Sequence, residues 1–151
     1  MRTVLALAFA TLALSPLAWS GDEKPAHPTV AYRHTLFEAA AKHMKMSGMI
    51  AKGEIDRPGD MLVHATALQG LSQDLVSLFP AGTGPDQAKT DAKAEIWSKP
   101  AQFATAATAF KDATAGLVDA AKTNDKAKFG AALGKVGESC GGCHETFRAE
   151  H

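Results

Sequence analysis

The sequence predicts an all-α protein, an antiparallel four-helix bundle, and three observations support this prediction. Apolar residues recur at steps of three and four along four segments, which is the period of an amphipathic helix. Glycine and proline separate these segments. Aromatic residues are only 7% of the 151 residues, a composition that disfavours a β-sandwich, whose strands favour aromatic and β-branched side chains. A chain of this length accommodates a single domain.

The first twenty residues have the features of a secretory signal peptide. Arg2 supplies a positive charge, residues 4–14 form a run of eleven that is apolar apart from Thr11, and small residues precede the expected cleavage point after Ser20. The run is shorter than the roughly 20 residues that span a bilayer. We therefore expect cleavage, export to the periplasm and a mature chain with no membrane anchor. Residues 21–28 would form a flexible lead-in to a bundle over residues 29–151.

The first two helices are expected over residues 29–52 and 56–79. Gly53 follows the first helix and is suited to the left-handed position that commonly ends a helix. Asp56 can cap the second helix, which must stop before Pro80 because proline lacks the amide donor needed to continue.

A longer connection over residues 80–97 leads to the second pair of helices. Its last two residues, Ile96 and Trp97, are too apolar to remain in water and should fold back onto the core. Ser98 is the expected N-cap of the third helix. Residues 123–125 end that helix and cap the fourth, whose apolar residues from Phe129 to Phe147 are spaced 4, 3, 4, 3 and 4.

The fourth helix carries the most specific motif, Cys140-Gly141-Gly142-Cys143-His144. A thioredoxin-like redox pair would need a βαβ context, and a zinc site would need a fourth ligand. In the third interpretation, two thiols add to the two vinyl groups of haem and the adjacent histidine binds the iron. Cysteines three residues apart share one helix face, and an alanine-rich bundle leaves room for a flat cofactor. We therefore favour haem c, attached at both cysteines, with His144 as axial ligand.

With this motif, the chain resembles the cytochrome c′ family, the four-helix class of c-type cytochromes. The motif alone is specific for haem, whereas its C-terminal position together with the other matches is specific for the family. The matching residues extend over the whole expected mature chain: Tyr32-Arg33, Lys52-Gly53-Glu54, Glu95-Ile96-Trp97-Ser98, and Cys140 to His144 with Arg148.

The resemblance implies roles for four charged or titratable residues. Arg33 would pair with a haem propionate, and its neighbour His34 would make a second, weaker contact. Asp91 falls where the connection of family members meets the haem edge. Arg148, one helical turn after His144, would lie near the axial imidazole and stabilise a small anion or polar diatomic on that side.

The resemblance also places Phe37 over the open side of the iron, at the position where low-spin relatives carry a ligating methionine. Phenylalanine has no lone pair to donate, so we expect five-coordinate iron. An apolar ring offers no hydrogen bond to bound dioxygen, which favours nitric oxide and carbon monoxide instead. The alternative is a six-coordinate, low-spin electron carrier with Met44 as sixth ligand. Met44 lies two turns beyond Phe37, a rise of about 10 Å.

The remaining expectations concern partners. Lysine plus arginine equals aspartate plus glutamate at 16 each, which disfavours binding to nucleic acid or to an anionic membrane. Electron transfer to an unidentified redox partner and binding of diatomic gases are the expected functions. A peroxidase-like enzyme would need an acid–base residue near Phe37, and the sequence offers none there.

Family members commonly dimerise through their first two helices, so a homodimer is plausible. The other histidines, His27, His43, His64 and His151, are expected at the surface.

Overall fold

The computed structural model describes residues 27–150, so the expected signal peptide, most of the lead-in and His151 lie outside the described residues. The elements in chain order are α1 (Pro28–Ala51), α2 (Asp60–Ser72), the short 3-10 helix η1 (Val76–Leu78), α3 (Glu95–Ser98), α4 (Pro100–Lys122) and α5 (Lys126–Phe147). Within the described residues, none of the helices is both long and apolar enough to cross a membrane.

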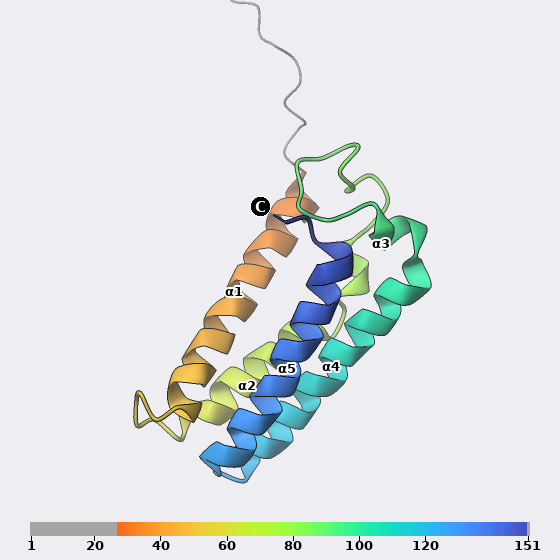
Figure 1. The fold of residues 1–151 in the computed structure, drawn as a ribbon. Coiled ribbons are helices and arrows are strands. Elements are labelled where there is room, and N and C mark those ends of the chain that lie inside the picture. The colour runs from red at the N-terminus through yellow and green to blue at the C-terminus, as the bar shows by residue number, and fades with distance from the viewer. Residues whose placement is uncertain (1–26, 151) are drawn as a thin grey trace, which may run out of the picture.

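The predicted four-helix bundle is confirmed. Helix α1 packs against α2 and α5, and α4 packs against the same two helices, so the four long helices surround a common core. The start of α1, the end of α5, α3 and the connection before α3 all lie at one end of the bundle (Figure 1). Residues from both ends of the described chain therefore meet in one region.

Two of the predicted helix ends are confirmed in detail. After α1, Gly53 has a φ of 73°, and the amides of Gly53 and Glu54 donate to the carbonyls of Ile50 and Met49 at 3.0 and 2.9 Å. This is the Schellman arrangement, which satisfies carbonyls at the end of a helix. At the start of α5, the Asp125 carboxylate accepts hydrogen bonds from two backbone amides of the first turn.

The start of α2 and the start of α4 differ from the prediction. Helix α2 begins at Asp60 rather than after Asp56, since turns closed by the carbonyls of Arg57 and Pro58 precede it, and the Asp56 carboxylate accepts from Lys126 Nζ at 2.9 Å instead of capping. Ser98 is not an N-cap: it belongs to α3, and α4 begins at Pro100 without a side-chain cap. Helix α2 ends at Ser72, before the predicted end at residue 79. The chain then continues through turns and η1 to Pro80.

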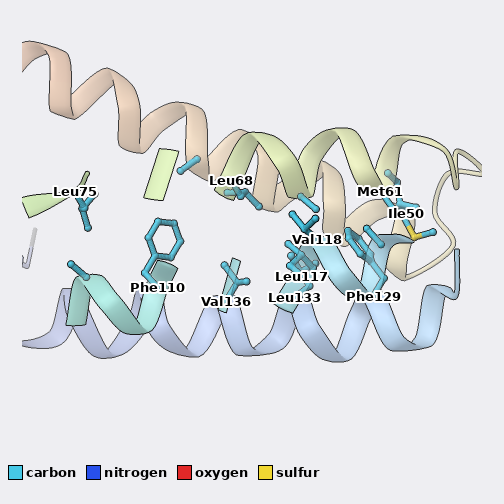
Figure 2. Close-up of a cluster of buried hydrophobic side chains, with 14 residues drawn as sticks. Ile50, Met61, Leu68, Leu75, Phe110, Leu117, Val118, Phe129, Leu133 and Val136 are labelled. Atoms are coloured by element: carbon cyan, nitrogen blue, oxygen red, sulfur yellow. The ribbon is translucent and has the colours of Figure 1, made fainter. Parts of the chain in front are cut away.

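Buried apolar side chains form two separate clusters. The main cluster fills the bundle between the four helices, as Figure 2 shows for Leu68, Leu117, Phe129 and Val136 among others. The second, which we call the aromatic cluster, consists of Ile96, Phe103 and Phe147 with Phe79 and Trp97 packed against them. The predicted return of Ile96 and Trp97 onto the core is thus confirmed.

Candidate haem site

The two cysteines lie on α5 at the boundary between the two clusters. Cys140 packs against the main cluster and Cys143 against the aromatic cluster. Both are free thiols and half-buried. Between them, Gly141 and Gly142 are exposed, and a Cβ added at either would meet nothing within 4 Å.

Burial keeps both thiols neutral. Burial, with a smaller effect of the neighbouring Cys140, raises the pKa of Cys143 to about 11, and burial also raises the pKa of Cys140. Reactive redox cysteines have lowered pKa values, and zinc binds the thiolate form. The described residues also gather no group of three or more histidine, cysteine or acidic side chains suited to a metal ion. The surroundings therefore disfavour the redox-pair and zinc interpretations.

The chemistry of these donors fits haem c. Cys140 and Cys143 would hold the two vinyl-derived carbons as thioethers, and His144 would supply the axial imidazole nitrogen. Burial lowers the pKa of His144, and the positive charge of Arg148 lowers it further. The imidazole is therefore neutral at neutral pH, which is the form that ligates a metal.

Phe37 is the residue of α1 whose ring contacts His144. The two ring centroids are 6.5 Å apart and the ring planes meet at 76°. Phe37 also contacts Phe79 of the aromatic cluster, at 6.4 Å between centroids. Met44 lies further along α1 and packs against the main cluster. The structure thus brings Phe37 and His144 together across the space between α1 and α5.

Arg33 is buried, with 3% of its surface exposed, and it joins α1 to the connection before α3. Its Nη1 donates to Thr83 Oγ1 at 2.9 Å, and its Nη2 donates to Thr83 O at 2.9 Å and to Thr90 Oγ1 at 2.5 Å. The guanidinium also lies over the ring of Phe79, 4.6 Å from its centroid. Burial lowers the pKa of Arg33. The guanidinium therefore anchors the connection, and its predicted pairing with a propionate remains a prediction.

The other side of the connection is fastened to the end of α5. Arg148 Nη2 lies 4.0 Å from Asp91 Oδ2, and the amide of Ala149 donates to the carbonyl of Asp91 at 2.7 Å. Two residues after Asp91, the amide and the ammonium of Lys93 donate to carbonyls near the end of α5. The structure thus brings Asp91 and Arg148 together beside the turn that carries His144.

His34 is the predicted site residue that the structure does not bring to this group. Its side chain is 66% exposed and lies 3.9 Å from Glu38 on the outer face of α1. Its predicted contact with the haem edge remains a prediction.

The sequence interpretation missed two features. Thr83 and Thr90 accept hydrogen bonds from Arg33, but threonine in an irregular connection has no periodicity that would single it out. His43 and His64 were expected as separate surface residues, whereas they are half-buried and paired, with 3.1 Å between their Nδ1 atoms. The signal available in the sequence was that the two histidines lie on consecutive helices, on either side of the link between them. His27 caps α1 by accepting from the Thr29 amide.

Comparison with known proteins identifies related sequences and structures. The family model described as "Cytochrome C'" matches residues 28–148. A cytochrome c' of Pararhodospirillum photometricum is 40% identical over 119 residues, which cover 79% of this chain and 94% of that protein. One of Rhodospirillum rubrum is 36% identical over 149 residues, covering 99% of both.

Solved structures agree with these sequence relatives. A cytochrome c' structure from "Rhodobacter Spheriodes" has a TM-score of 0.75 at 34% identity, covering 82% of this chain and 96% of that one. Variants of cytochrome c prime from Alcaligenes xylosoxidans match with TM-scores of 0.72 at 32% identity, covering 81% of this chain and 94% of theirs. One was solved as a nitric oxide complex and another with carbon monoxide bound.

Proposed function

The chain belongs to the cytochrome c′ family and binds haem c, and on this basis we propose that it is a periplasmic protein with five-coordinate iron that binds nitric oxide and carbon monoxide and transfers single electrons. When bound, haem supplies an iron that changes between ferrous and ferric states and has one position free for a diatomic ligand. Cys140 and Cys143 would hold the group, and His144 would be the protein ligand. These roles require no acid–base catalysis, so we infer that the protein is not an enzyme.

The ring contact between Phe37 and His144 is the observation that carries the proposal. It supports an apolar ring, rather than a thioether, as the α1 side chain that would face the iron opposite His144. Such a ring excludes water and offers neither a lone pair to the iron nor a hydrogen bond to a ligand. Phe37 would therefore leave the sixth position open while selecting against ligands that need a hydrogen bond, dioxygen in particular.

The relatives and the surrounding residues support the choice of diatomic ligands. Related proteins have been solved with nitric oxide and with carbon monoxide, two ligands that depend less on a hydrogen-bond donor. On the other side, Arg148 lies close enough to His144 to lower the pKa of the imidazole. Its positive charge would favour a polar diatomic there. Asp91 would hold the guanidinium near that side.

Absorption spectra test the proposal directly. The purified ferric protein should show a high-spin spectrum, and the reduced protein should bind carbon monoxide and nitric oxide without displacing a protein ligand. A low-spin ferric spectrum, or a stable oxygen complex of the reduced protein, would contradict it. Isolation of the coloured protein from a periplasmic fraction tests the proposed location.

Two matched substitutions on α1 distinguish the proposal from the six-coordinate alternative. Met44→Leu should leave the ferric spectrum and carbon monoxide affinity unchanged, because Met44 packs in the main cluster. Phe37→Met should convert the iron to a low-spin form and weaken carbon monoxide binding by about tenfold or more, since the gas must then displace a thioether. A change from low to high spin in Met44→Leu would instead support Met44 as ligand.

A further inference from the structure

We propose that His43 and His64 form a second metal site, which binds one divalent transition-metal ion, copper most tightly, between α1 and α2. The site is separate from the haem: His43 lies six residues beyond Phe37, a rise of about 9 Å along α1. It shares none of the residues that would hold haem. The proposal therefore does not depend on the proposed gas binding or on the coordination of the haem iron.

The spacing of the two imidazoles suits a metal chelate. Their Nδ1 atoms are 3.1 Å apart, and the ring centroids are 5.3 Å apart with the planes at 52°. A metal ion bonded to both nitrogens at about 2.0–2.1 Å would make an angle of about 100° between them. That angle lies between the square-planar and tetrahedral values, the geometries of Cu²⁺ and Zn²⁺ sites.

The nitrogens are already arranged without the ion. At 3.1 Å the two Nδ1 atoms are within hydrogen-bonding distance, and which of them donates depends on the tautomers of the rings. For a metal to bind between them, the ring that carries its proton on Nδ1 must carry it on Nε2 instead. The two histidines come from different helices that already pack together. Binding thus requires little rearrangement of the backbone, which favours affinity.

Both rings are accessible to an ion in solution. The rings are half-buried rather than enclosed, so an ion can reach them from solvent.

The imidazole ligands determine which metal ions the site can bind. They suit copper, nickel and zinc, and among divalent ions of this row affinity is highest for copper. Magnesium prefers oxygen ligands and should not bind. The carboxylate of Asp60, one helical turn before His64, is hydrogen-bonded to Arg57. The described residues form no three-ligand group, so water would complete the coordination. Cys140 and Cys143, the sole cysteines of the sequence, would be thioethers in the haem-loaded protein and would not compete as thiols.

Calorimetric titration of the ferric, haem-loaded protein with copper sulfate tests the site, after treatment with a chelator that is then removed. We expect one equivalent of Cu²⁺ to bind more tightly than any further ions, Zn²⁺ to compete for it and Mg²⁺ to have no effect. His43→Gln and His64→Gln should each weaken this binding by about tenfold or more, because a second ligand on the neighbouring helix acts at high effective concentration. The matched control is His34→Gln, an exposed histidine on the same helix, which should leave the affinity unchanged.

A second measurement covers the case in which a substitution disturbs the fold. At a hundredfold excess of Cu²⁺ over its dissociation constant, the unfolding midpoint of the unsubstituted protein should rise by about 5–10 °C, with no change in the haem absorption spectrum. The proposal would be overturned if His43→Gln or His64→Gln weakened copper binding by less than about threefold. It would also be overturned if His34→Gln weakened copper binding as much as these variants do. An unchanged midpoint in the unsubstituted protein would overturn it as well.

Discussion

Ser47 is a polar residue at a buried position that offers its hydroxyl no hydrogen bond. It is fully buried in α1, and among the buried side-chain polar atoms of the described residues its hydroxyl is the one without a hydrogen-bond partner. A buried hydroxyl without a partner loses its interaction with water and gains nothing in exchange. Serine is also a weaker helix former than alanine.

Ser47→Ala should therefore stabilise the protein by about 1 kcal/mol, as measured by denaturant unfolding of the haem-loaded form. The matched control is Ser72→Ala in α2, where the equally buried hydroxyl pairs with Thr114 Oγ1 at 2.9 Å. That substitution should cost about 1 kcal/mol or more, because Thr114 loses a buried partner. A loss of stability in Ser47→Ala would show that the hydroxyl has a partner after all.

For single residues, the sequence predicts relative positions within one helix, but it does not predict contacts between two helices. The cysteine and histidine motif could be interpreted because its spacing within one helix fixes the relative positions of its members. The pairing of His43 with His64 depends on how two helices are rotated against each other, and the sequence of either helix alone does not determine that rotation. The same applies to Arg33, whose partners lie in an irregular connection.

The connection before α3 is bonded to both α1 and the end of α5, beside the candidate haem site. Arg33 fastens it to α1 through Thr83 and Thr90, and Asp91 fastens it to the end of α5. Few regular backbone hydrogen bonds hold such a segment, so its position depends on these side chains.

Arg33→Met should destabilise the protein by about 2–4 kcal/mol, because it leaves buried acceptors without a donor. Hydrogen exchange should accelerate most at the amides of residues 83–92. Arg33→Lys should restore little, since one ammonium cannot replace two guanidinium nitrogens that face different acceptors. Arg57→Met, which removes an exposed arginine paired with Asp60, is the control and should change neither quantity appreciably. Equal exchange rates in all three variants would contradict the anchoring role.

The boundaries of the elements show where local signals compete with tertiary contacts. Gly53 and Asp125 act as predicted because their effects depend on backbone within one turn. Asp56 was predicted as a cap, but a lysine 70 residues further along the chain takes its carboxylate. Ser98 belongs to the short helix α3 and does not act as the expected cap. Its neighbour Trp97 donates its indole N–H to the carbonyl of Phe79 at 3.0 Å. Contacts of this range are not encoded in a local pattern.

At the scale of the whole molecule, the core is divided into two clusters that meet at the candidate haem site. Cys140 and Cys143 lie where the clusters meet, each packed against a different one. The four-helix architecture was predictable because amphipathic helices of this length bury their apolar faces in few ways. The division into two clusters was not, because it depends on which aromatic side chains gather at one end.

A chain with Cys140→Ala and Cys143→Ala should lose covalently bound haem, because no thiol remains to form a thioether. After export with the haem-attachment machinery present, acid–organic extraction should remove all colour from this variant and none from the unsubstituted protein. The matched control keeps both cysteines and carries Ser139→Ala on the adjacent position of α5, and it should retain its colour. Haem that resists extraction from the double variant would contradict the assigned attachment.

The contact between Phe37 and His144 joins residues that are 107 positions apart in the chain. Closing so long a segment has a large entropic cost, and contacts of this kind slow folding. Helix α1 by itself, or the hairpin of α4 and α5 by itself, supplies only one of the two rings. The pairing of these two rings is therefore a property of the completed bundle, and any fluctuation that lifts α1 away from α5 separates them.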